Sequence, residues 1–245
     1  MTETRDLFPK YVKTLPTDLM AITDSIYLYG SMARGDVADN SDCDILVAVD
    51  DCDAEMFEHL RSELQEWHPE LNCEFAIYQI SALKSMCAKG SLFLWHIKSE
   101  AIKIYSAGNQ LEDILENLLP YNGTMDALSE YKDIMKDIED DPLDDAQLMV
   151  YNLSLMATLI RNTCIVCCYV MGNMLFGRVS PVKYCLSHWQ EAFPINIQEY
   201  EELYQYRVAL NRGGEIPEQP VLKQYYNMWK RKTNQLITLS FSLVE

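Results

Sequence analysis

The sequence is short of basic residues. Lys and Arg number 20 against 37 Asp and Glu, so the formal net charge is −17 and the isoelectric point is about 4.6. Proteins that bind long nucleic acids obtain much of their affinity from Lys and Arg contacts to phosphate. The composition therefore argues against a long nucleic-acid partner. The acidity itself has two interpretations, solubility or an electrostatic field that attracts a cationic substrate.

The chain also lacks an apolar leader at its start. The residues MTETRDLFPKY contain no hydrophobic stretch flanked by small residues, so no secretory signal is predicted. Eight cysteines without an export signal are typical of reduced thiols, and we expect a cytoplasmic protein. Repeats and low-complexity tracts are missing too, which indicates an ordinary globular chain.

The sequence also lacks an uninterrupted apolar segment typical of a membrane span. Residues 146–177 are apolar, but Arg161 and several amide side chains interrupt them. Since an arginine at the bilayer centre costs about 2.5–3.5 kcal/mol on insertion scales, we expect a buried helix of a soluble domain and no membrane partner. An arginine buried in such a helix needs an anion, which is either a carboxylate partner or a substrate or triphosphate. Arg178 and Arg207 are other possible phosphate contacts, although single arginines are more often solvated surface charges.

Histidine is scarce, and the four residues show no paired spacing typical of a metal site. Cys164 and Cys167 have C-x-x-C spacing, with Cys168 next to them, but the sequence offers no fourth ligand close by, so we expect core cysteines. A ribonuclease motif that would begin at Arg161-Asn162 lacks its histidine, because Val166, Cys167 and Cys168 occupy the positions for it. The sequence therefore does not favour a ribonuclease.

Hydrophobic patterning predicts an α+β protein of two domains. Strand-like runs at 25–29, 44–49, 73–80 and 101–106 alternate with helical patterns at 53–67 and 81–98, the latter broken near Gly90. After residue 107 only helical periodicity remains, with long helices expected at 146–171, 197–210 and 221–243. We therefore predict a small mixed-sheet domain over residues 1–106, followed by an all-helical bundle domain over residues 107–245. The acidic segment 137–145 is the candidate hinge.

Two aspartates open the second predicted strand. Asp42 and Asp44 lie on one face of a strand, with Cα atoms roughly 6–7 Å apart at about 3.3 Å per residue. Such a pair can hold Mg²⁺, which takes one or two carboxylates and fills its other positions with water and substrate phosphate. Two such ions can hold the attacking and leaving oxygens of a phosphoryl or nucleotidyl transfer.

A phosphate cradle is predicted at the end of the preceding strand. Gly30 lets the backbone come close to a ligand, and Ser31 adds a hydroxyl donor at the start of a short helix. Arg34 lies one turn further on, where it can reach an anion or clamp the aspartate strand.

Glu74 is the candidate third carboxylate. Strand alternation places Glu74, Ala76 and Tyr78 on one face and Cys73, Phe75 and Ile77 on the other. An acid at the start of an apolar strand is costly to bury without a partner. Glu74 is therefore predicted to ligate a metal, to act as general base on an incoming hydroxyl, or both.

The segment GSMARG, followed after DVADNS by DCD, resembles the G-S-x-x-x-G and D-x-D signature of the DNA polymerase beta-like nucleotidyltransferase superfamily. A small first domain with a helical second one is similar to the bacterial minimal nucleotidyltransferases and the aminoglycoside nucleotidyltransferases. The signature covers residues 25–50 specifically and 73–106 more loosely.

The resemblance implies transfer of a nucleoside monophosphate, with ATP or another nucleoside triphosphate as donor and Mg²⁺ as cofactor. By position, Asp42, Asp44 and Glu74 would be the catalytic and metal-binding carboxylates. The residues that would bind the nucleotide are Gly30, Ser31, Arg34 and Ser41. The expected partners are the triphosphate and a small, cationic acceptor such as an aminoglycoside. A protein acceptor, as in protein adenylyltransferases, and a non-catalytic nucleotide-binding module are the alternatives.

Overall fold

The computed structural model describes residues 17–37, 42–67, 72–140 and 145–244. The chain divides into two compact units, Met1–Asn122 and Gly123–Glu245. The first unit contains, in chain order, α2 (Thr17–Ile22), β1 (Thr23–Tyr29), α3 (Gly30–Arg34), β2 (Cys43–Val49), α4 (Ala54–Glu66), β3 (Cys73–Gln79), α5 (Ile80–Ala88), α6 (Leu92–Glu100), β4 (Ile102–Ser106) and α7 (Gln110–Glu116).

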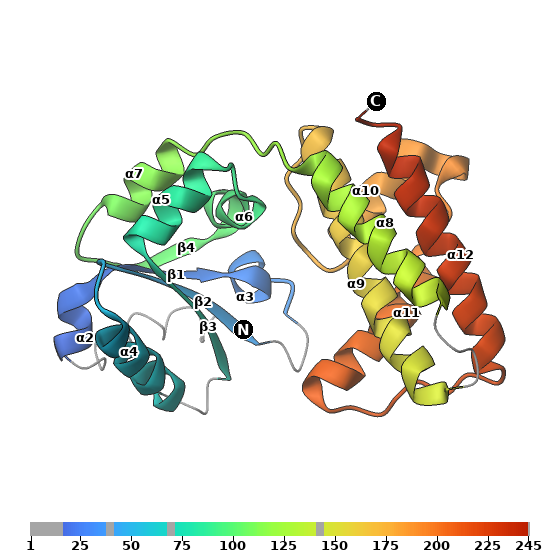
Figure 1. The fold of residues 1–245 in the computed structure, drawn as a ribbon, viewed down its shortest axis with the longest axis horizontal. Coiled ribbons are helices and arrows are strands. Elements are labelled where there is room, and N and C mark those ends of the chain that lie inside the picture. Colours follow the sequence, from blue (N-terminus) through green and yellow to red (C-terminus); the bar gives the residue numbers. More distant parts are fainter. Residues whose placement is uncertain (1–16, 38–41, 68–71, 141–144, 245) are drawn as a thin grey trace. The chain divides into compact units, whose positions relative to one another are not determined.

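The four strands form one mixed sheet in the order β3-β2-β1-β4. β1 runs antiparallel to both β2 and β4, whereas β2 and β3 are parallel. Helices α2 and α4 cover one face of the sheet, and α5, α6 and α7 cover the other (Figure 1). This arrangement, followed by a helical unit, confirms the predicted α+β class.

Strand alternation decides which side chains enter each layer. On β3, Cys73, Phe75 and Ile77 pack on the α4 side, while Ala76 and Tyr78 pack with α5 and α6. This is the alternation predicted from the sequence. It follows that Asp44 and Glu74, at the starts of β2 and β3, belong to the face that α5, α6 and α7 cover.

The boundary between the units lies after Asn122, not after residue 106 as expected. The reason is the apolar face of α7, where Leu111, Ile114 and Leu115 pack into the same core as Leu46 of β2. Loss of strand-like patterning at residue 107 marked the end of the sheet, but one more helix of this unit follows it.

Asp24 ties α7 to the sheet. The carboxylate of Asp24, on β1, accepts hydrogen bonds from the backbone N–H of Gln110 (3.1 Å) and of Leu111 (3.2 Å), the first two residues of α7. The Ser25 hydroxyl donates to the same carboxylate at 3.0 Å, and Asp24 is only 4% exposed. Gly108 fits closely beside it, because a Cβ there would lie 2.3 Å from Asp24 Oδ1. The carboxylate therefore provides the N-terminal capping interaction of α7.

The second unit is helical. It contains α8 (Thr124–Asp140), α9 (Ala146–Val170), α10 (Ser180–Trp189), the short 3₁₀ helix η2 (Gln190–Ala192), α11 (Ile197–Arg212) and α12 (Leu222–Phe241). The expected hinge at 137–145 is wrong, since residues 137–140 continue α8 and Asp145 caps α9 within the same unit. Residues 141–144 of that segment lie outside the described residues.

The core of the second unit is built around α9, which packs against α8, α10, α11 and α12. By length and composition α9 resembles a membrane span, yet 67% of its most apolar window is buried in the protein. Its buried Asn152 donates to the Tyr226 hydroxyl (3.2 Å), which donates to the Ile138 carbonyl (3.3 Å). This burial and polar network agree with the interpretation as a core helix.

Four cysteines meet in that core. Cys164, Cys167 and Cys168 of α9 are joined by Cys185 of α10, a fourth thiol that sequence spacing did not reveal. Hydrogen bonds to the neighbouring thiols, together with burial, raise the pKa of Cys185, and burial raises that of Cys164. No group of three His, Cys, Asp or Glu side chains placed to hold a metal ion occurs in the described residues. The cysteines are core residues, as expected.

Replacing Asp24 by Ala should lower the free energy of unfolding by about 1–3 kcal/mol, because the backbone N–H groups of Gln110, part-buried, and Leu111, buried, lose their acceptor. Urea unfolding followed by circular dichroism measures the loss. Asp133→Ala, which removes an exposed partner of Lys136, should change stability by about 1 kcal/mol or less. Equal losses in the two variants would contradict the capping role of Asp24.

Candidate active site

The site begins where β1 passes into α3. Gly30 has a φ of +71°, a conformation that side chains with a Cβ rarely adopt. A Cβ at this position would lie 2.0 Å from Oδ2 of Asp44, so only glycine leaves room for that carboxylate. The antiparallel register explains the proximity, because Tyr29, the residue before Gly30, pairs with Asp44. The turn and the aspartate strand are thus in direct contact.

Asp44 and Glu74 lie side by side on neighbouring strands. The parallel register of β2 and β3 pairs them directly, which places their Cα atoms about 4.8 Å apart. Asp44 is half-buried, and Glu74 is exposed. The cost of burying an unpaired acid therefore does not arise for Glu74. An exposed carboxylate on an edge strand is open to a ligand or a substrate proton.

Asp42 lies immediately before β2 and is held by a residue that the sequence analysis did not select. The Asn72 side-chain amide donates to Asp42 Oδ1 at 2.9 Å, and the Asn72 carbonyl accepts from the Cys43 N–H at 3.0 Å. Asn72 has a φ of +47°, which asparagine tolerates better than most residues. Ser41, the neighbouring candidate, lies outside the described residues.

Ser31 is the second residue of α3, a helix of five residues. The residue before the helix, Tyr29, provides no side-chain cap, and Gly35 ends the helix in the left-handed conformation. The Ser31 side chain is half-buried. Its hydroxyl and the first backbone N–H groups of α3 are suitable donors for a phosphate oxygen.

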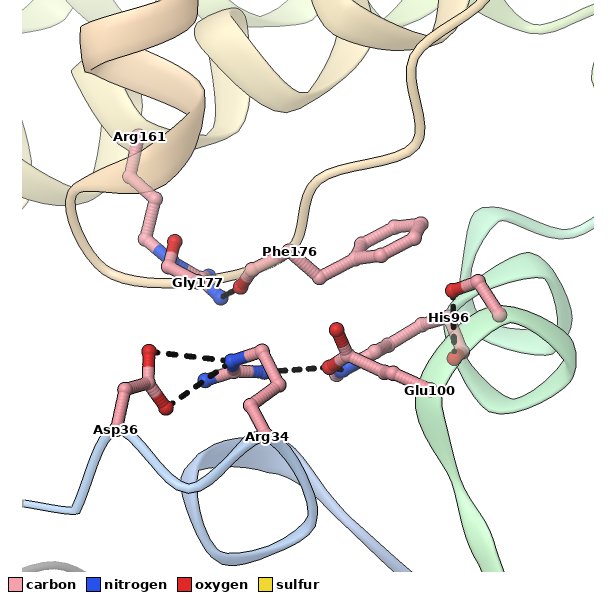
Figure 2. A network of polar contacts seen from close by, with 8 residues as sticks. Arg34, Asp36, His96, Glu100, Arg161, Phe176 and Gly177 are labelled. Carbon is pink, nitrogen blue, oxygen red and sulfur yellow. Dashed lines mark hydrogen bonds and ion pairs between the residues drawn. The ribbon is translucent and has the colours of Figure 1, made fainter.

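Arg34, at the end of α3, lies among carboxylates. Its Nε donates to both Asp36 oxygens at 3.1 and 3.2 Å, and its Nη1 pairs with Oε1 of Glu100 at the end of α6. Figure 2 shows the guanidinium between these two acids. The same Glu100 oxygen pairs with Nε2 of His96 one helical turn earlier. Arg34 therefore links α3 to α6, and its predicted role in nucleotide binding stays a prediction.

Tyr29 pairs with Asp44 in the sheet and packs against α6. Its ring makes edge contacts with His96 and Phe93, with centroid distances of 5.4 and 5.7 Å. Burial, followed by the negative charges of Asp44 and Glu74, raises the pKa of the Tyr29 hydroxyl above its ordinary value. The phenol therefore stays protonated beside the carboxylates at neutral pH.

The donor set suits Mg²⁺. Asp42, Asp44 and Glu74 offer only oxygen ligands, and Asp44 directly adjoins the Gly30 turn, which the sequence analysis predicts to be the phosphate site. Within the described ranges, no three such side chains already form a closed metal cage. Mg²⁺ does not need one, because it commonly uses one or two carboxylates together with water and substrate phosphates.

The second unit carries half-buried arginines of its own. Arg161 of α9 donates to the backbone carbonyls of Phe176 and Gly177 (Figure 2). Arg207 donates to the Thr158 hydroxyl, and the Arg178 guanidinium lies 4.9 Å from the Tyr204 ring centroid. The two alternatives for the anion near Arg161, a carboxylate or a substrate, stay open.

Comparison with known proteins identifies the first unit. Residues 21–110 match the family model "Polymerase beta, Nucleotidyltransferase". The N-terminal unit is a nucleotidyltransferase domain of the DNA polymerase beta-like superfamily. The chain is accordingly a nucleotidyltransferase, as the Gly-Ser and Asp-x-Asp motifs predicted. A search of curated proteins found no match to this nucleotidyltransferase.

Solved structures provide a second comparison. The spectinomycin adenyltransferase AAD(9) from Enterococcus faecialis, crystallised with ATP and spectinomycin, is 15% identical to this nucleotidyltransferase, with a TM-score of 0.54. The match covers 94% of this chain and 98% of that one, so the likeness in fold extends over both units. A toxin-antitoxin structure with AMP-PNP is 18% identical over 54% of this chain and 98% of that one, with a TM-score of 0.34.

Gly30→Ala should displace the Asp44 carboxylate, whereas Gly35→Ala tests backbone strain alone. Both glycines have positive φ, and a Cβ at Gly35 meets nothing within 4 Å. The left-handed conformation should cost each variant roughly 1–2 kcal/mol of stability. If Asp44 holds Mg²⁺ beside a bound nucleotide, only Gly30→Ala should also lose Mg²⁺-dependent ATP binding. Calorimetric titration tests this, and equal ATP affinity in the two variants would contradict the importance of the Gly30–Asp44 contact.

Proposed function

We propose that this nucleotidyltransferase transfers AMP from ATP to a hydroxyl of a small, cationic acceptor with Mg²⁺ as cofactor. The observation that carries the proposal is the contact between the Gly30 turn and Asp44, with Glu74 paired beside it, in a polymerase beta-type domain. This arrangement joins phosphate donors and metal-binding carboxylates in one place, which is what nucleotidyl transfer requires.

Each group has a chemical role in this proposal. Gly30 and Ser31 bind the triphosphate through the backbone and the hydroxyl. Asp42 and Asp44 hold Mg²⁺, which when bound offsets the charge that develops on the phosphate oxygens. Glu74 accepts the proton of the acceptor hydroxyl. The hydroxyl oxygen then bonds to the α-phosphorus, the bond from that phosphorus to its bridging oxygen breaks, and pyrophosphate leaves.

The choice of acceptor rests on charge and on fold. A net charge of −17 favours association with a cationic molecule. The structure of similar fold over both units was crystallised with ATP and spectinomycin, which supports an aminoglycoside-like acceptor. Modification of such an antibiotic would make resistance the biological role. All eight cysteines are free thiols, which supports a reducing cytoplasm as the place of the reaction.

A labelled-nucleotide assay tests the proposal. The protein is incubated with each α-labelled triphosphate, Mg²⁺ and a panel of aminoglycosides, aminocyclitols, polyamines and polypeptides. Asp42→Asn and Asp44→Asn should lower transfer about a hundredfold or more, because metal stabilisation of transition-state charge contributes several kcal/mol. Glu58→Gln, which changes an exposed acid of α4, should match the wild type.

The outcomes separate the alternatives. Label on an aminoglycoside or polyamine supports the proposal, whereas label only on polypeptide supports a protein adenylyltransferase. A protein that binds ATP with Mg²⁺ but labels nothing is the non-catalytic module. If both aspartate variants transfer label at the wild-type rate, the assignment of Asp42 and Asp44 to a metal site is wrong.

Glu74→Gln separates a base from a metal ligand. If Glu74 only accepts the proton, Mg²⁺-dependent ATP binding should be unchanged while kcat falls about 10²–10⁴-fold. If Glu74 is a ligand, the Mg²⁺ concentration for half-maximal ATP binding should rise as well. Calorimetry at several Mg²⁺ concentrations, with steady-state kinetics, distinguishes the two. Unchanged binding and unchanged kcat would exclude both roles.

A further inference from the structure

We propose that Glu100 is a positioning residue for the nucleotide site, acting through Arg34 on the α3 turn. The inference rests on the proposed function, since it assigns α3 to triphosphate binding. Glu100 itself belongs to α6 and is not one of the three site carboxylates. Its importance comes from the two partners that share its Oε1 atom, Arg34 and His96.

The α3 helix depends on outside contacts for its position. With five residues and no side-chain cap at its start, it has too few hydrogen bonds to be stable alone. On one side, Ala33 is buried and Met32 packs in the apolar layer with α4. On the other side, the contact to α6 comes from Arg34 and Glu100 (Figure 2). Arg34 thus connects the turn to α6, a helix of nine residues.

Glu100 is held in turn by α6. Leu94 and Ile97 of this helix are buried against the sheet, with exposures of 0% and 2%. His96, four residues before Glu100, pairs with the same carboxylate oxygen, and its ring lies against Tyr29, the residue that precedes Gly30. Glu100 therefore has a fixed position from which it can orient the Arg34 guanidinium.

The burial of this network distinguishes it from the surface ion pairs of the same unit. The side chains of Arg34, Glu100 and His96 are 20%, 14% and 14% exposed. Lys103 and Glu112, which link β4 to α7, are 44% and 36% exposed. A half-buried charge pair is less screened by solvent, and removing one partner leaves the other poorly compensated. Glu112 therefore provides a matched control for Glu100.

The test compares Glu100→Gln with Glu112→Gln in the full chain. In the proposed function Gly30 and Ser31 bind phosphate in the ground state and the transition state alike, so their misplacement should raise KM rather than lower kcat. We expect the KM and the dissociation constant for ATP with Mg²⁺ to rise about tenfold in Glu100→Gln, as for loss of one charged hydrogen bond. Glu112→Gln should keep wild-type values.

A second pair of variants tests the route through Arg34. If Glu100 acts through Arg34, the double variant Arg34→Gln/Glu100→Gln should have the same KM as Arg34→Gln within about twofold, whereas independent effects would multiply. Amide hydrogen exchange over residues 30–35 should be faster in Glu100→Gln than in Glu112→Gln, because the turn has lost its contact with α6.

The outcomes distinguish this inference from the proposed function. Wild-type ATP affinity in Glu100→Gln, multiplicative effects in the double variant, or a fall in kcat at unchanged KM would overturn the positioning role alone. A wild-type protein that does not bind ATP with Mg²⁺ would overturn the proposed function, and this inference with it. A raised KM with unchanged kcat, absent from Glu112→Gln, supports the role.

Discussion

The arrangement of the candidate site depends on one steric contact, the packing of the Asp44 carboxylate against the backbone of Gly30. No larger residue fits at position 30, because both the positive φ and the 2.0 Å approach of Oδ2 exclude a Cβ. This contact fixes the distance between the turn after β1 and the strand that carries Asp44, the two parts that the proposed function assigns to phosphate and to metal. The antiparallel pairing of Tyr29 with Asp44 maintains it along the sheet. The rest of the unit supports this one contact, with α4 on one face and α5, α6 and α7 on the other.

Much of this arrangement could be predicted from the sequence, because it depends on neighbours along the chain. Strand periodicity placed Glu74 on the same face as Ala76 and Tyr78, and local motifs identified Gly30 and Asp44. The partners of these residues could not be predicted in the same way. Arg34 meets Glu100 across 66 positions, and Asp42 meets Asn72 across 30. No periodicity relates such pairs, since the sheet and helix packing create them.

Two signals were nevertheless present for the missed residues. His96 and Glu100 have the i, i+4 spacing that joins side chains on one helical face. Asn72 directly precedes a strand, at a position where a left-handed residue is common. The domain boundary failed for another reason. The apolar face of α7 is visible in the sequence, but whether it covers the sheet or the helical core depends on tertiary packing. In the structure it packs on the sheet, and Asp24 of β1 caps the helix there.

The edge position of β3 ties the chemistry to the accuracy of folding. Among the strands of the described residues, β3 pairs with β2 alone. A shift by one residue would keep a parallel sheet but would turn Glu74 toward the α4 layer and Phe75 toward the opposite layer. Glu74 would then no longer pair with Asp44 on one face of the sheet. The apolar side chains of Cys73, Phe75 and Ile77 oppose this shift, because they lose their buried contacts when the strand slips. The packing of these three apolar side chains thus favours the strand register that places the Glu74 carboxylate beside Asp44.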